Sequence, residues 1–293
     1  MNIVARLIVR GALSGAVAGL VAFVFARIFA EPIISSAIDY ESGRDAAQDA
    51  LDKAAGVAIP AEGPDIFSRT VQMDVGIGAG LILFGAAMGA LVAVGYVVAI
   101  GRVGRIRPFQ LALLIPAFYF FAVYAVPFLK YPANPPAIGH EETIRTRGAL
   151  YLVLVAVSCI ALFGAVVVGQ QLYRRFSLYS SVLLAALGYA VVMGIMFVAL
   201  PELGHLHANV VEYGRHATET PLPLKDPSGR IVFPGFPADL LAKFRVYSVI
   251  NQLILWGGIA LLFAPQARKL LDPGAAEAAK TTRLVEQDSK VAV

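Results

Sequence analysis

Apolar and polar positions alternate along this chain in long blocks. Six apolar blocks are each close to the ~20 residues that a helix needs to cross the ~30 Å hydrocarbon core of a bilayer. They cover about residues 7–29, 75–100, 109–128, 150–168, 181–200 and 246–263. The pattern predicts an all-α integral membrane protein built as a bundle of six transmembrane helices.

The composition agrees with this fold class. Hydrophobic residues make up 58% of the 293 residues and charged residues only 15%, against roughly a quarter in soluble domains. The formal net charge is +4, but the basic residues flank the apolar blocks. We therefore expect the lipid bilayer, and no nucleic acid, as the partner of that charge.

The basic residues also predict an orientation. Short segments rich in Lys and Arg are retained on the cytoplasmic side of a membrane. Here they occupy the start of the chain, the second and fourth connections and the end of the last block, at Arg6, Arg10, Arg102, Arg105, Arg107, Arg174, Arg175, Arg268 and Lys269. Both termini are then cytoplasmic, and the other three connections form three long outer loops. We expect a multi-pass protein of a bacterial cytoplasmic (inner) membrane.

The pattern divides the chain into two parts. Residues 1–272 form one polytopic membrane domain. Residues 273–293 are rich in Ala, Lys, Glu and Gln and lack an apolar face, which predicts a flexible cytoplasmic tail.

Small residues recur at fourfold spacing in the first two blocks. In lipid, such ridges let helix backbones approach closely. The spacing predicts a packing face and carries no information about substrate. The residues are Gly11, Gly15 and Gly19 in the first block, and Gly76, Gly80, Gly85 and Gly89 in the second.

All four histidines fall in segments assigned to the outer side. Neutral imidazole is a common ligand for divalent cobalt, nickel and zinc, and carboxylates accompany it readily. The candidate metal ligands are His140, His205, His207 and His216, with Glu212 among them. The alternative is ordinary solvated residues, because the outer loops simply hold more residues.

The segment 201–220 fits two conformations. As a helix it places His205, Asn209, Glu212 and His216 on one face, with an apolar face beside it. As an extended chain it makes His205 and His207 the chelating pair, because side chains at i and i+2 then point the same way. The sequence is compatible with both.

Two carboxylates lie at the outer ends of apolar blocks. Glu31 ends the first block and Asp74 begins the second. Ionisable residues at such depths are rare and mark ion pathways in many transporters. Glu31 and Asp74 could form an acidic vestibule, or could be interfacial carboxylates in headgroup water.

Sequence features of enzymes are missing. The chain has no H-E-x-x-H, no clustered cysteines and no phosphate-binding G-x-x-x-x-G-K-[ST] loop, and Cys159 is its single cysteine. We therefore expect no catalytic residues and no permanently bound cofactor.

The third connection carries a distinctive proline-rich element. Residues 128–139 read Phe-Leu-Lys-Tyr-Pro-Ala-Asn-Pro-Pro-Ala-Ile-Gly, and Glu142-Thr143-Ile144 follows. A second segment, Phe236-Pro237-Ala238-Asp239-Leu240-Leu241, leads into the last block. With Glu31-Pro32 and the acidic loop after the first block, these elements resemble the CbtA family of predicted cobalt transporter subunits over about residues 1–265.

The resemblance implies a membrane subunit for uptake of Co²⁺, or of nickel, beside a small single-span partner that bears histidines. The transported ion is then cargo. The alternative is a non-transporting structural or accessory subunit of a larger membrane complex. Prolines fix φ, so we expect the element to form a rigid cap, with Asn134 offering an oxygen to the ion path.

Overall fold

The computed structural model describes residues 2–58, 68–104 and 106–271, and most of them are helical. Six helices are long and apolar enough to cross a membrane, which confirms the predicted fold class. They run over Ile3–Ala54, Val71–Ala99, Pro108–Lys130, Glu141–Leu172, Leu178–His205 and Ala238–Leu271. The predicted tail at 273–293 lies outside the described residues.

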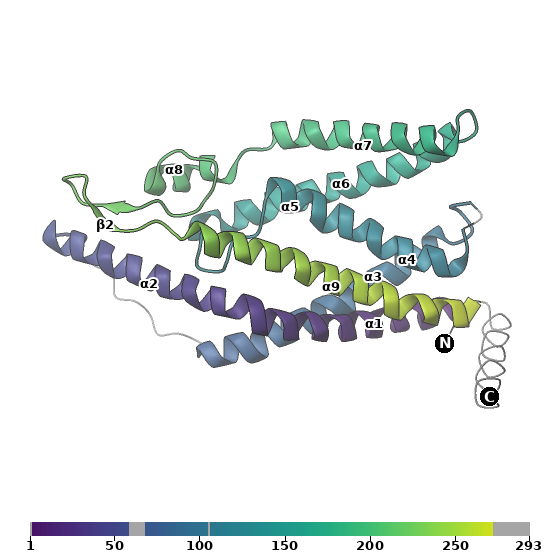
Figure 1. Cartoon of the computed structure of the whole chain (residues 1–293), viewed down its shortest axis with the longest axis horizontal. Helices are drawn as coiled ribbons and strands as arrows, with labels where there is room; N and C mark the ends of the chain where they lie inside the picture. Colours follow the sequence, from purple (N-terminus) through teal and green to yellow (C-terminus); the bar gives the residue numbers. More distant parts are fainter. Residues whose placement is uncertain (1, 59–67, 105, 272–293) are drawn as a thin grey trace, which may run out of the picture. The chain divides into compact units, whose positions relative to one another are not determined.

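Figure 1 labels the helices and strands of the chain. The described residues divide into two compact units. The first combines the described residues of Met1–Phe25, Arg69–Phe120 and Asn251–Val293. The second combines those of Ala26–Ser68 with Phe121–Ile250. Helix α9 (Ala238–Leu271) contributes to both units.

In the first unit, α1 (Ile3–Phe25) and α3 (Ile77–Ala99) lie against each other through glycine. Gly15 faces Gly85 and Gly11 faces Gly89, so closely that a Cβ on any of them would overlap a carbonyl oxygen opposite. The glycine ridge predicted from the spacing is confirmed there. A Cβ placed on Gly80 would have no atom of another helix among the described residues within 4 Å, so the predicted packing face does not extend to that residue.

Aromatic contacts complete the core of this unit. The ring of Phe263 on α9 meets Tyr96 on α3 edge-on, with 5.5 Å between ring centroids. The ring of Trp256 on α9 stacks with Tyr119 at 6.0 Å, at the end of α4 (Pro108–Tyr119). The unit also includes a π-helical turn, η2 (Val71–Gly76), directly before α3.

The second unit begins where α1 continues through the π-helical turn η1 (Ala26–Ala30) into α2 (Glu31–Ala54). The acidic composition of this segment predicts an outer loop, whereas most of it is a helix in the structure. The helix contains many Ala, Gln, Asp, Lys and Arg residues, whose side chains can face water. The side chain of Gln48 donates a hydrogen bond to Asp52, one turn further along the helix. Because the apolar part ends near Ala30, we assign α2 to the space outside the hydrocarbon core.

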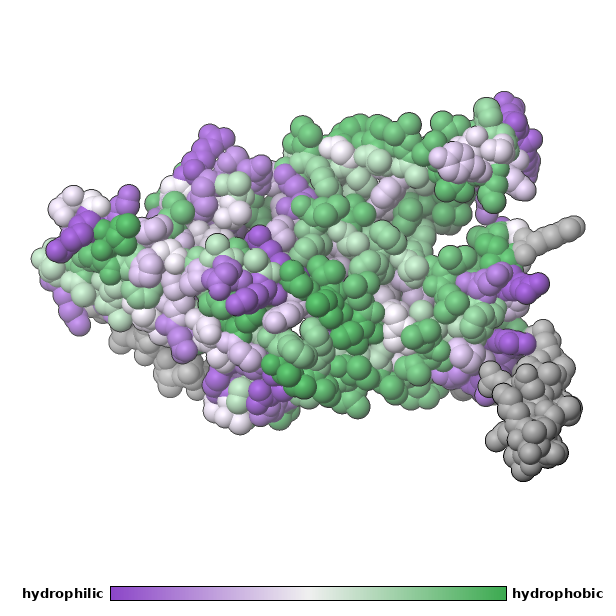
Figure 2. All heavy atoms as spheres, in the orientation of Figure 1, coloured by the Kyte–Doolittle hydropathy of each residue, from purple (hydrophilic) through white to green (hydrophobic). Residues whose placement is uncertain are grey.

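Helices α6 (Ile144–Leu172) and α7 (Leu178–Ala199) form a pair in the same unit. The hydroxyls of Ser158 and Tyr189 lie 2.9 Å apart between them. Apolar residues cover both helices in Figure 2, whereas hydrophilic residues gather around α8 and β2. This division matches helices that face lipid and a polar layer that faces water.

The three segments predicted to lie on the outer side meet in one place. Ala37 of α2, Ile138 of the proline-rich element and Phe236 before α9 form one buried apolar cluster. Tyr40 of α2 donates a hydrogen bond to the carbonyl of Pro234 at 2.9 Å. The remaining elements of this layer are η4 (Glu141–Thr143), η5 (Leu203–His205), α8 (His207–Tyr213) and the antiparallel pair β1 (Leu224–Lys225) and β2 (Ile231–Phe233). The third span continues after α4 through η3 (Phe120–Ala125) and α5 (Val126–Lys130).

Candidate functional site

The proline-rich element connects several parts of the second unit. The Tyr131 hydroxyl donates a hydrogen bond to the carbonyl of Pro201 at 2.8 Å. The Arg245 guanidinium on α9 donates to Oδ1 of Asn134 at 2.9 Å and to the carbonyl of Ala133 at 3.3 Å. With the prolines fixing φ, these bonds hold the segment in one conformation.

Glu219 is the centre of a buried polar network beside this element. Its side chain is 1% exposed, and Arg147 of α6 donates to Oε2 at 2.6 Å. Asn209 of α8 donates to Oε1 at 3.2 Å. The Thr143 hydroxyl lies 2.9 Å from Oε1 and 2.7 Å from the carbonyl of His140. The network therefore ties α6, α8 and the backbone of His140 together.

A cavity of about 410 Å³ opens next to this network. It is lined by Tyr131, Asn134, Arg147, Tyr151, Leu203 and Glu219, among others. Because Arg147 and Glu219 form an ion pair within hydrogen-bond distance, the wall that they share carries little net charge. We interpret this cavity as a structural feature of the outer layer.

One pair of the predicted metal ligands comes together. Nε2 of His140 lies 2.9 Å from Oε2 of Glu212, which is 43% exposed. Nδ1 of His140 accepts a hydrogen bond from the backbone N–H of Glu142 at 3.2 Å. The Tyr213 ring lies beside the imidazole, and the Arg44 guanidinium covers the Tyr213 ring at 5.4 Å. His140 is thus oriented from both sides with Nε2 directed at a carboxylate.

The other three histidines have separate surroundings. Nε2 of His205 lies 3.6 Å from Glu202, and His207 is exposed at the start of α8. Both ring nitrogens of His216 lie within hydrogen-bond distance of backbone carbonyls, those of Gly214 and Thr220. Within 2–58, 68–104 and 106–271, no three His, Cys, Asp or Glu side chains are arranged to hold one metal ion.

The segment 201–220 takes neither of its two expected conformations throughout. Helix α8 covers only His207–Tyr213, and Gly214 ends it with a φ of +75° that favours glycine. Asn209 points inward to Glu219, whereas Glu212 is exposed, so the two do not share a face. His205 precedes the helix and His216 follows it.

The residues predicted along the ion path are found in different surroundings. Glu31 opens α2 in the second unit and is buried, whereas Asp74 lies in η2 of the first unit. Asn134 accepts its hydrogen bond from Arg245. No pattern in the sequence indicates a role for Arg147 or Glu219. Their 72-residue separation has no periodic signal, and Glu219 sits between two threonines as a surface residue would.

Several carboxylates lie close together where α2 faces η4. Burial, and then the neighbouring carboxylates of Asp45 and Glu141, raise the pKa of Glu41 from 4.5 to about 7. A carboxyl group whose pKa is higher in the folded state stabilises the protein at pH values below its pKa in the unfolded state. This contribution is lost as the pH rises through its pKa in the folded state. The contribution of Glu41 to stability should therefore decline as the pH rises from about 4.5 through about 7.

We expect Glu41→Gln to abolish this loss, because an amide stays neutral. At pH 8 the variant should melt at a higher temperature than the wild type, and at pH 4 the two should melt alike. Thermal unfolding in detergent at several pH values measures this difference. Glu202→Gln, at an exposed position, is the matched control. Equal melting temperatures of Glu41→Gln and the wild type at pH 8 would contradict the assignment.

Comparisons with known proteins agree with the resemblance noted in the sequence. No curated protein and no solved structure matches the chain. One family model, described as probable cobalt transporter subunit (CbtA), matches residues 4–268. The matched range includes the proline-rich element and all four histidines. It also covers the six long helices up to the last turn of α9. The chain belongs to the CbtA family of probable cobalt transporter subunits.

Proposed function

We propose that this multi-pass transport subunit carries divalent cobalt from the outer side of a bacterial cytoplasmic membrane to the cytoplasm. Family membership supports the cargo, and the word subunit in the family description implies a complex. A small single-span partner bearing histidines, as the resemblance implies, would complete that complex. Nickel, which prefers similar ligands, is the competing cargo.

The His140–Glu212 pair carries the proposal for where the ion first binds. Two ligands about 2.1 Å from one ion and at right angles to each other are about 3.0 Å apart. The 2.9 Å between Nε2 and Oε2 is close to that separation. Because Nδ1 accepts a hydrogen bond, Nε2 carries the proton in the metal-free protein, and binding would release it to water.

The surroundings of the pair suit a cation that must leave again. The carboxylates of Glu41 and Asp45 on α2 and of Glu141 beside His140 lie near one another. Glu141, which follows His140 in the chain, adds negative charge beside a site where Glu212 is open to water. Two protein ligands leave the remaining positions of a hydrated ion to water, so binding is weak enough for release.

The other predicted ligands are less suited to this first step. His216 is oriented by two backbone carbonyls, and Oδ1 of Asn134 already accepts a bond from a guanidinium. A cation gains less from an oxygen that faces a positive charge. Glu31 and Asp74 remain the carboxylates that we propose for later stages of the path.

Calorimetric titration of the purified protein with Co²⁺ tests the binding step. His140→Gln and Glu212→Gln should each weaken binding by about tenfold or more, because each removes one of two protein ligands. His207→Gln replaces an exposed histidine of the same layer and should leave the affinity unchanged. Wild-type affinity in both ligand variants would contradict the assignment of this pair.

Uptake by reconstituted vesicles tests the transport step. Vesicles that contain the chain together with its partner should accumulate Co²⁺, and His140→Gln should reduce the initial rate at low ion concentration. If the complex accumulates Co²⁺ equally well without this chain, the chain is an accessory subunit.

A further inference from the structure

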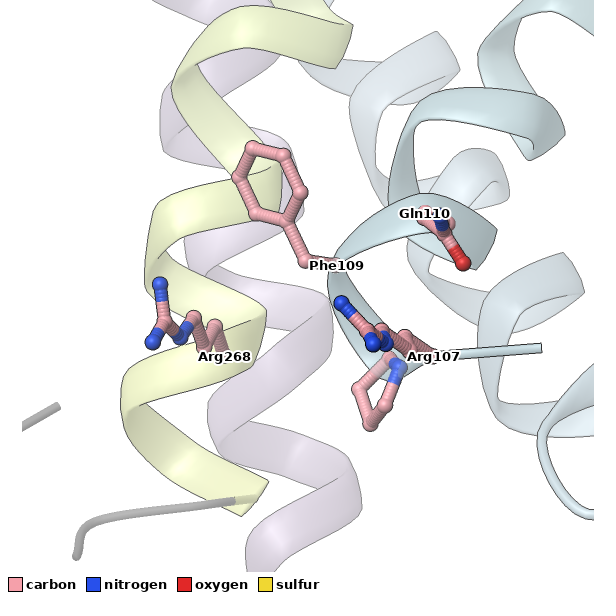
Figure 3. Close-up of a pocket in the computed structure, with 5 residues that line it drawn as sticks. Arg107, Phe109, Gln110 and Arg268 are labelled. Carbon is pink, nitrogen blue, oxygen red and sulfur yellow. The ribbon is translucent and has the colours of Figure 1, made fainter. Parts of the chain in front are cut away.

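A cavity in the first unit lies where α4 begins and α9 ends (Figure 3). Its volume is about 440 Å³. The described residues that line it are Arg107, Pro108, Phe109, Gln110 and Arg268. They offer Co²⁺ neither a carboxylate nor an imidazole. The groups that could adjust the proposed ion site lie in the second unit instead, around His140 and Glu212.

The two proposed cobalt ligands belong to two short elements. His140 directly precedes η4, which has three residues, and Glu212 lies in α8, which has seven. Helices of this length are unstable by themselves, because few hydrogen bonds form for the residues that must be fixed. The 2.9 Å between Nε2 of His140 and Oε2 of Glu212 therefore depends on contacts that hold η4 and α8 together.

One oxygen atom makes such a contact with both elements. Oε1 of Glu219 accepts a hydrogen bond from the Thr143 hydroxyl in η4 at 2.9 Å and one from the Asn209 amide in α8 at 3.2 Å. The Thr143 hydroxyl also lies 2.7 Å from the carbonyl of His140. Asn209 precedes Glu212 by about one turn of α8. Both ligands are thus connected to the same carboxylate oxygen.

The carboxylate of Glu219 is itself fixed from a third element. Arg147 donates to Oε2 at 2.6 Å from α6, which is a helix of 29 residues. Gly139 leaves the space for this pair, because a Cβ on it would lie 2.5 Å from Nη1 of Arg147 and 3.0 Å from Oε2 of Glu219. Its φ of +136° also favours glycine. Glu219 therefore connects both ligands to a long, regular helix.

We propose that Glu219 is a positioning residue of the cobalt site, which sets the separation of the His140 and Glu212 side chains through Thr143 and Asn209. This role rests on the proposed function, because it requires that the pair binds Co²⁺. Residues that orient metal ligands commonly change metal affinity by about 10- to 100-fold, although they do not touch the ion. Loss of this network should therefore weaken binding while both ligands remain.

Calorimetric titration of the purified full chain with Co²⁺ tests this role in Thr143→Val, which keeps the shape of the side chain and removes its hydroxyl. Oε1 of Glu219 still accepts from Asn209 in this variant. The carbonyl of His140 still accepts from the backbone N–H of residue 143, so the fold should persist. We expect the affinity to fall by about tenfold. Thr143→Ser, which keeps the hydroxyl, should restore it.

A double-mutant cycle separates positioning from a general loss of stability. In the His140→Gln background, Thr143→Val should change the affinity by less than about twofold, since the ligand that it positions is already absent. Thr218→Val makes the same change at an exposed neighbour of Glu219 and should leave the affinity unchanged.

The outcomes distinguish this role from the proposed function. Wild-type affinity in Thr143→Val, together with weaker binding in His140→Gln, would overturn the positioning role while the cobalt site stands. An equal loss from Thr143→Val in the wild type and in His140→Gln would show a general effect on the fold, which also overturns it. Co²⁺ binding that is absent, or unaffected by His140→Gln, would contradict the proposed site, and the positioning role would fail with it.

Discussion

Glu219→Leu should destabilise the second unit by about 3 kcal/mol or more, because it leaves the Arg147 charge partly buried without its counter-charge. The lost carboxylate also removes one of the two acceptors within reach of each of Asn209 and Thr143. The apparent unfolding midpoint in detergent measures the effect. Glu202→Leu, at a carboxylate that is 47% exposed, is the matched control and should shift the midpoint little.

A double variant makes this test specific to the ion pair. Removing both charges, in Glu219→Leu with Arg147→Met, should restore much of the stability, since two apolar side chains can replace a buried pair. If Glu219→Leu is as stable as Glu202→Leu, the ion pair between Arg147 and Glu219 contributes nothing to stability. A double variant as unstable as the single one would assign the loss to packing instead.

Gly15→Ala should be the most damaging small substitution in the first unit. Its methyl group would overlap the carbonyl oxygen and carbon of Gly85, which are backbone atoms that cannot rotate away. Forcing α1 and α3 apart disrupts every contact along the glycine ridge, so we expect a loss of at least about 3 kcal/mol. Thermal unfolding of the purified variant measures this loss.

Gly80→Ala on the facing helix provides a control of opposite sign. Apart from its chain neighbours and the backbone of its own helix, no atom of the described residues lies within 4 Å of its Cβ position, so the methyl group meets no obstacle. Alanine favours a helix over glycine by about 1 kcal/mol, and the variant should be slightly more stable than the wild type. Equal losses in Gly15→Ala and Gly80→Ala would contradict the close packing of α1 and α3.

The sequence predicts the spans well because lipid imposes a simple requirement. Each crossing must satisfy its own backbone within one helix, so about 20 apolar residues identify it. The ridge at Gly11 and Gly15 is predictable for a related reason, since close helix contact in lipid selects small residues. Helix α2 is missed because its acidic residues suggest a loop, although they suit a helix that packs one face on Ile138 and Phe236.

The candidate site is predictable only in part. His140 and Glu212 are 72 residues apart, and only the folded proline-rich element brings them together. The Arg147–Glu219 pair depends on the same long-range folding. Periodicity within 201–220 cannot show that Gly214 stops α8 early or that Asn209 turns inward, because both depend on tertiary contacts.

The length of α2 determines how strongly the charge of the lipid surface influences ion binding at the proposed site. Arg44, which covers Tyr213 beside His140, lies 13 residues after Glu31, about 20 Å along the helix axis. The Debye length at physiological ionic strength is about 8 Å, so the charge of the lipid surface is largely screened at that height. Occupancy of the His140–Glu212 pair should therefore follow the bulk concentration of Co²⁺, and changing the fraction of anionic lipid should leave it unaltered.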